Sequence, residues 1–91
     1  MPVDLKQFEL NRIVNMLKSM EWTVVSSGFQ GHKVVATFEK TAPGMNVDLK
    51  KIEADRITTM LKSFTWDVVG AEYPENKIVL KFEKVVKGEV G

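Results

Sequence analysis

The hydrophobic and polar positions of this chain follow one pattern twice. Residues 1–40 align without a gap with residues 45–84, and 20 of the 40 aligned pairs are identical. Each copy opens with apolar residues spaced three and four apart and then changes to strict alternation, which indicates one helix followed by two strands. We therefore expect an internal duplication with the element order α-β-β-α-β-β.

The helical pattern covers residues 5–20 in the first copy and residues 49–64 in the second. Asp4 and Asp48 are the predicted N-caps, because aspartate accepts hydrogen bonds from the first helical turn. The spacing places Leu10 on the exposed side of the first helix, and its counterpart in the second likewise. The residues expected to face the core are Leu5, Phe8, Ile13, Met16, Leu17 and Met20, and, in the second helix, Leu49, Ile52, Ile57, Met60, Leu61 and Phe64.

The alternating segments form two predicted hairpins. Trp22 and Trp66 open the first strand of each copy as core anchors, and residues 32–40 and 77–86 form the second strands. Two amphipathic helices must cover one face of a sheet. The predicted fold is therefore α+β, a four-stranded antiparallel sheet with both helices on one face, pseudo-twofold symmetry and a permuted ferredoxin-like order. The pattern leaves the strand order open, and also whether hairpins pair between chains.

Length and composition predict one domain. A copy of 44 residues is too short to bury a core of its own, so the repeats 1–44 and 45–84 should share one, followed by a short tail, 85–91. The chain has no cysteine, so it has no thiolate metal site. It also has no apolar run of the length that a membrane span needs. We expect a cytoplasmic protein without a membrane partner.

Positive and negative charges are nearly balanced, with 13 Lys and Arg residues against 12 Asp and Glu residues. Residues 1–44 carry five basic and four acidic residues, and residues 45–91 carry eight of each. Neither half has the basic excess that is typical of nucleic-acid-binding domains. A nucleic-acid partner is therefore not favoured, although total charge does not define how charge is distributed over the surface.

Four charged residues lie inside the predicted apolar arcs of the helices. A charge in a core is costly unless it is paired, and the i, i+3 spacing lets each glutamate reach an arginine. We expect ion pairs at the seam between the helices, made crosswise between the copies. The alternative is that the helices sit shallowly and the long side chains reach water. The four residues are Glu9, Arg12, Glu53 and Arg56.

The sheet face opposite the helices is the candidate interface. Alternation predicts a small valine patch there, ringed by lysine and glutamate, with Phe29 and Tyr73 at the hairpin tips. Such a patch fits a protein partner or a homodimer. It also fits a platform for single-stranded nucleic acid, or an ordinary solvated face. The predicted interface residues are Val25, Val35, Val69, Val79, Lys33, Lys77 and Lys81.

No catalytic motif is present in the sequence. It has no Gly-rich phosphate loop, no Ser/His/Asp or Cys/His set and no carboxylate cluster with metal-ligand spacing, so we expect no catalytic residue, cofactor or metal. The leading prediction is a non-enzymatic binding or assembly module that acts through protein–protein contact or self-association. The alternative is a small nucleic-acid-binding or regulatory protein that uses the open sheet face.

His32 is the single histidine, and Asn76 takes its place in the second copy. We expect His32 to lie at a loop edge without a function. The segment with Leu17-Lys18, Trp22, Val25 and Gly31-His32 resembles the helix–strand–histidine segment of HicA-type mRNA interferase toxins, over about 20 residues. The resemblance implies a catalytic role for His32. The chain departs from that pattern in two ways: no serine precedes the histidine, and a helix follows the second strand where the family has a third strand.

Overall fold

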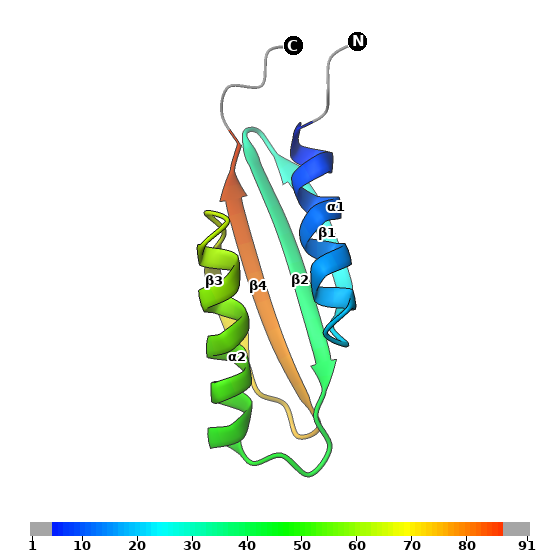
Figure 1. Cartoon of the computed structure of the whole chain (residues 1–91), viewed down its shortest axis with the longest axis vertical. Helices are drawn as coiled ribbons and strands as arrows, with labels where there is room; N and C mark the ends of the chain where they lie inside the picture. The colour runs from blue at the N-terminus through cyan, green and yellow to red at the C-terminus, as the bar shows by residue number, and fades with distance from the viewer. Residues whose placement is uncertain (1–4, 87–91) are drawn as a thin grey trace.

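The computed structural model describes residues 5–86 and shows the predicted order of helices and strands (Figure 1). All strand pairs are antiparallel and both helices lie on one face of the sheet, so the α+β architecture with a four-stranded antiparallel sheet is confirmed. No helix among these residues is long and apolar enough to span a membrane. The elements are α1 (Leu5–Lys18), β1 (Thr23–Gln30), β2 (Lys33–Thr41), α2 (Val47–Lys62), β3 (Asp67–Glu72) and β4 (Lys77–Val85).

The strand order is β1-β2-β4-β3, so the second strand of each hairpin is central and the first is at an edge. The central strands β2 and β4 pair along their whole lengths, with Thr37 opposite Lys81 at the middle. Thr37 and Lys81 are 44 positions apart in the sequence. Val25 and Val69 have the same separation, and the register of each edge strand shifts at that valine, which marks a β-bulge.

The helices are rotated from the predicted orientation. Leu10 is 6% exposed and Phe8 is 56% exposed, and in the second helix Ala54 is 2% exposed and Ile52 is 64% exposed. The predictions for these four residues were wrong, and so was that for Leu49, which was expected in the core and is 47% exposed. Residues two apart on a helix lie about 200° apart, so burying the stripe that contains Leu10 turns Phe8 to solvent. The buried stripes are Leu10, Ile13 and Leu17 in α1, and Lys50, Ala54, Ile57 and Leu61 in α2.

The N-cap of the second helix lies two residues before the predicted one. Asn46 is the N-cap of α2, and its side chain accepts a 2.9 Å hydrogen bond from the backbone N–H of Leu49. The predicted cap, Asp48, instead lies in the first turn, where its charge favours the positive end of the helix dipole. The other predicted cap, Asp4, lies outside the described residues.

Each helix is followed by a turn of the same type. Glu21 and Thr65 have positive φ angles of 70° and 65°. The next residue in each case, Trp22 or Trp66, donates its backbone N–H to the carbonyl five residues earlier, at 2.9 and 3.0 Å respectively. This is the hydrogen bond of a Schellman motif. Both tryptophans are 1% exposed and serve as the expected core anchors.

The core lies between the helices and the sheet. The inward-facing residues of the central strands are buried, as alternation predicted, and the rings of Phe38 and Phe82 lie 6.3 Å apart. The expected C-terminal tail overlaps the last strand, because β4 includes Val85 and the buried Val86 donates its N–H to the carbonyl of His32 at 2.7 Å. Residues 87–91 lie outside the described part of the chain.

Candidate interaction surface

Five of the residues of the predicted interface lie on the sheet face opposite the helices, in the central strands: Lys33, Val35, Lys77, Val79 and Lys81. In β2 and β4, Val35 and Val79 alternate with buried residues and are themselves half-buried by their neighbours on the open face. The bulge residues Val25 and Val69 are 55% and 47% exposed. Each of these valines lies at a bulge of an edge strand, next to the residue that pairs with Thr37 or Lys81. We call this surface the open face.

The charges of the open face are mixed. Two ion pairs cross the central strands: Lys33 to Glu83 at 3.8 Å and Lys77 to Glu39 at 3.5 Å. Pairs this exposed contribute little to stability. Lys81, at the centre of the face, has no ion-pair partner within residues 5–86. A cation without a partner beside exposed valines is able to bind an acidic group.

A shallow groove lies beside Lys81, with a volume of about 350 Å³. It exists on this side of the sheet because Gly70 has no side chain, whereas Ser26 is the residue at the corresponding place in the first copy. The groove joins an apolar floor to one cation and one carboxylate. Its lining residues are Thr37, Gly70, Ala71, Glu72, Val79 and Lys81.

The two hairpin-tip aromatic residues do not belong to the open face. Phe29 pairs with the inward-facing Val34, and the ammonium nitrogen of Lys6 lies 5.8 Å from the centre of its ring. Tyr73 is half-buried and packs against the core. Both residues lie near the hairpin tips as expected, but neither adds an aromatic ring to the open face, because strand alternation turns Phe29 toward the helices and Tyr73 packs against the core.

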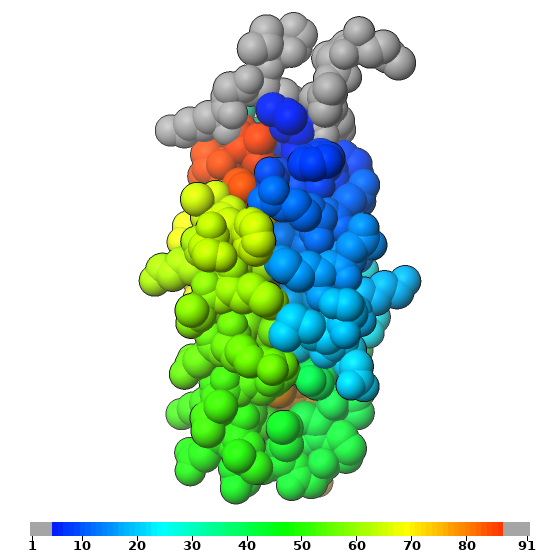
Figure 2. Space-filling model, viewed as in Figure 1, coloured from blue at the N-terminus to red at the C-terminus, as the bar shows by residue number. Residues whose placement is uncertain are grey.

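On the other face of the sheet, charged side chains connect the two halves of the chain. The side chains of the two halves meet there along one seam (Figure 2). The charged side chains form two clusters, and each cluster contains a glutamate and an arginine from one helix and a lysine from the central strand of the other half. The first cluster is Glu9, Arg12 and Lys84, and the second cluster is Glu53, Arg56 and Lys40.

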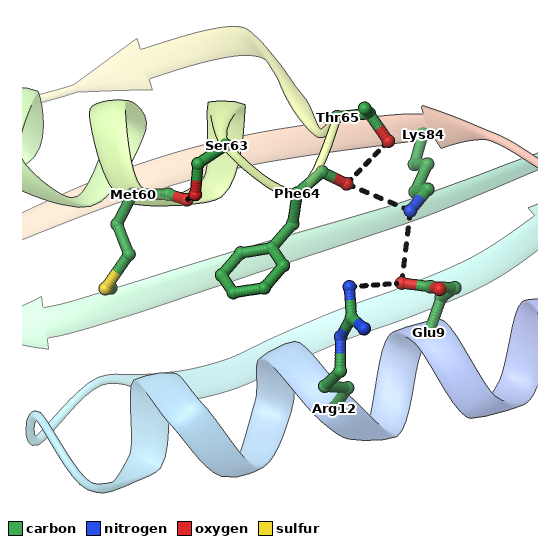
Figure 3. A network of polar contacts seen from close by, with 7 residues as sticks. All are labelled: Glu9, Arg12, Met60, Ser63, Phe64, Thr65 and Lys84. Carbon is green, nitrogen blue, oxygen red and sulfur yellow. Dashed lines mark hydrogen bonds and ion pairs between the residues drawn. The ribbon is translucent and has the colours of Figure 1, made fainter.

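In the first cluster both cations approach the same oxygen (Figure 3). Glu9 Oε1 lies 3.2 Å from Arg12 Nη2 and 3.1 Å from Lys84 Nζ. These are ion pairs without hydrogen-bond geometry. Lys84 also donates a 2.9 Å hydrogen bond to the carbonyl of Phe64, and the guanidinium carbon of Arg12 lies 4.6 Å from the centre of the Phe64 ring. Arg12 therefore packs against the other half through a cation–π contact.

In the second cluster the contacts are hydrogen bonds. Glu53 Oε2 accepts from Lys40 Nζ at 2.9 Å and from Arg56 Nη2 at 3.0 Å. Partial burial raises the pKa of Glu53, but the hydrogen bond and charge of Lys40, together with those of Arg56, outweigh it. The pKa therefore lies below its ordinary value of 4.5.

The expected ion pairs thus form in a different way. Each Glu–Arg pair lies within one helix, and a strand lysine makes the crosswise contact. The arginine side chains are 40% and 58% exposed, so their charged ends reach water as the alternative proposed.

Sequence reasoning missed three lysines of the helix-facing side. Lys40 and Lys84 lie two residues after Phe38 and Phe82, so alternation alone assigns them to that side. Lys50 is 3% exposed and its ammonium donates to the carbonyls of Pro74 and, at 2.8 Å, Glu75. No local signal marks Lys50, because its partners are backbone groups of a distant turn.

His32 lies exposed in the turn between β1 and β2, where its carbonyl accepts the hydrogen bond from Val86. Within residues 5–86, no group of three or more His, Asp or Glu side chains is arranged to hold a metal ion. The side chains that the fold brings together are therefore those of the open face and of the two charged clusters.

No protein-family model matches the chain, and no curated protein or solved structure matches it either.

Proposed function

We propose that this protein is a non-enzymatic binding or assembly module that acts through protein–protein contact at the open face. The observation that carries the proposal is a sheet face with two valines in its central strands and two at the bulges of its edge strands, a groove, and a central lysine that has no ion-pair partner within residues 5–86. An apolar centre with a polar rim is the usual anatomy of a protein interface. We place this activity in the cytoplasm.

The position of Lys81 indicates which kind of partner the open face prefers. In a face-to-face dimer of this chain, the centre of one face meets the centre of the other, so the two copies of Lys81 approach each other. A partner that brings an acidic group over Lys81 and an apolar side chain into the groove fits better, because opposite charges then meet. A protein segment with both features is the proposed ligand.

We further infer that the chain descends from a homodimer of single αββ units joined into a tandem repeat, with pseudo-twofold symmetry and a permuted ferredoxin-like order. Three observations support this. The pairing of β2 with β4 is centred on positions 44 apart, both edge strands have a bulge at corresponding valines, and the two charged clusters use corresponding residues. Two structural units that fit each other in this way form one domain.

The competing proposal is a small nucleic-acid-binding or regulatory protein. Three lysines on the open face favour it, namely Lys33, Lys77 and Lys81. The same face carries four carboxylates, and its flanking aromatic residue Phe29 points to the other side. Both features weaken a stacking platform with a positive groove.

The first test selects a random peptide library on the wild-type protein, with the variant Val35→Lys/Val79→Lys as the counter-selection. Both substitutions place charge on the open face and leave the edge strands unchanged. We expect enriched peptides to combine Asp or Glu with an apolar residue, and to bind the variant at least about tenfold more weakly, which is a loss of about 1.4 kcal/mol. Equal binding to both proteins would refute the open face as the site.

The competing proposal is tested in parallel. Labelled single-stranded RNA is titrated against the protein at low and high salt, with Lys81→Thr as the variant. Binding that weakens steeply with salt and with loss of Lys81 would favour a nucleic-acid partner. Light scattering of the Val35→Lys/Val79→Lys variant shows whether the open face also holds a second copy: a smaller mass than that of the wild type would mean that it does.

A further inference from the structure

The two edge strands of the sheet differ in their protection against further pairing. Within the described residues, β1 pairs only with β2 and β3 pairs only with β4. β1 runs for eight residues, TVVSSGFQ, without a charged residue or a proline. β3 runs for six residues, DVVGAE, with an acidic residue at each end. Because charge, proline and short length are the usual means of protecting an edge, β1 is the unprotected one.

Corresponding positions of the two copies show the difference directly. Thr23 and Gly28 of β1 correspond to Asp67 and Glu72 of β3. After β3 the chain continues into Pro74, which cannot donate to a strand ladder. The two edges have the same place in the fold and the same bulge, so the side chains account for the contrast.

A second groove lies along the unprotected edge, with a volume of about 150 Å³. All of its lining residues come from α1, β1 or the link between them, so it belongs to the edge and not to the seam. The groove contains the apolar Val14, whereas the corresponding residue in the second repeat of the same chain is Thr58. The lining residues are Val14, Lys18, Trp22, Thr23 and Val24.

We propose that β1 pairs in antiparallel fashion with β1 of a second copy of this chain, joining the two sheets into one continuous sheet. The edge exposes Val24, Val25 and Phe29 by 37%, 55% and 43%. Another uncharged edge with apolar side chains matches this surface, and β1 itself is such an edge. In a twofold contact both copies use the same surface patch, so β1 of one copy pairs with β1 of the other.

The rest of the sheet is compatible with this contact. The bulge at Val25 lies near the start of β1 and leaves Ser26–Gln30 in regular register, so five consecutive residues are available. The protected edge β3 limits the assembly to two copies, because its carboxylates would oppose each other in a second contact of this kind. The contact uses the sheet edge, so it is independent of the open-face proposal.

The test transfers the charges of β3 to β1. In Thr23→Asp/Gly28→Glu each copy gains two carboxylates on β1, one of them at position 28 in the middle of the contact, and like charges across a strand pair destabilise it. A Cβ atom at Gly28 meets no atom within 4 Å, so the fold tolerates the change. We expect the wild type to have the mass of a dimer by light scattering at low and high salt. The dissociation constant of the variant should rise at least about tenfold.

The control is Asn15→Asp/Thr59→Glu, which adds the same two negative charges at exposed helix positions and should leave the dimer intact. Hydrogen exchange then locates the contact: amides of Ser26–Gln30 should exchange faster in Thr23→Asp/Gly28→Glu, and those of β3 should not change. If the double variant fails to fold, Gly28→Glu alone provides the same test.

A monomeric wild type, or a Thr23→Asp/Gly28→Glu dimer as stable as the wild type, would overturn the proposal. A dimer that dissociates with Val35→Lys/Val79→Lys but not with the β1 variant would overturn it too, and would assign self-association to the open face. Neither result depends on whether the open face binds acidic peptides, so the two proposals can fail separately.

Discussion

At the scale of single residues, the left-handed positions after each helix store backbone strain. Glu21→Gly should raise the free energy of unfolding by about 0.5–1 kcal/mol, because glycine adopts a positive φ without the steric penalty of a side chain. Thr65→Gly should gain at least as much, since Thr65 is β-branched. Urea denaturation measures both effects. The control is Gly44→Ala, which places a side chain at φ 75° and should have the opposite sign.

The buried Lys50 should matter more than its counterpart Lys6. Lys50 bonds two carbonyls of the β3–β4 turn from a position that is 3% exposed, whereas the half-buried Lys6 makes one 3.0 Å hydrogen bond to the carbonyl of Gly31. Lys50→Met should lower the free energy of unfolding by about 1–2 kcal/mol, because the turn carbonyls lose their donor. Lys6→Met should cost less. Equal losses in denaturant melts would contradict this account.

At the scale of elements, the second cluster connects α2 to the central strand β2 and makes stability depend on pH. The pKa of Glu53 is lower in the folded protein than its ordinary value, so the unfolded chain binds the proton more readily. The cluster therefore stabilises the fold above about pH 4.5, and this contribution is lost as the pH falls through the lowered pKa.

Lys40→Met should lower the free energy of unfolding at pH 7 by about 1–2 kcal/mol, a value discounted for partial solvent exposure. The difference from the wild type should shrink once acid protonates Glu53, and urea melts along a pH series measure it. Lys62→Met, at an exposed position of the same helix, is the control and should follow the wild type. A loss that is the same at all pH values would mean that Lys40 acts through packing and not through charge.

The sequence predicted element type and order because the spacing of apolar residues changes from helical to alternating at the same point in each copy. The helix orientation was not predictable, since Phe8 and Leu10 are both apolar and only contact with the sheet selects between their stripes. The open face followed from alternation alone. Its groove did not, because it also needs Thr37 of β2 beside β4 and the register shift at Val69, and neither strand order nor a bulge has a local signal.

At the scale of the whole molecule, the two halves are unequal partners because Thr37 faces Lys81 at the centre of the sheet. If two copies of the second half paired with each other in this register, Lys81 of one would face Lys81 of the other. Like charges in that position are unfavourable. The fragment 45–91 carrying Lys81→Thr should therefore self-associate more tightly than the unchanged fragment, by about 0.5–1 kcal/mol. Sedimentation measures this. Lys77→Thr is the control, since Lys77 would face Val85 in the same dimer. No difference between the two variants would contradict the argument.

The ends of the two central strands have a consequence for chain connectivity. Ala42 donates its N–H to the carbonyl of Asn76, and Val86 donates to that of His32, both at 2.7 Å. One exit leads through Pro43 and Gly44 into α2, and the other ends at the same end of the sheet as the start of α1 (Figure 1). The connection from β2 to α2 therefore has an equivalent place between the end of β4 and the start of α1, where the chain is not joined. A circular permutant that starts at α2, and joins β4 to α1 through a second copy of this linker, keeps every contact between the halves.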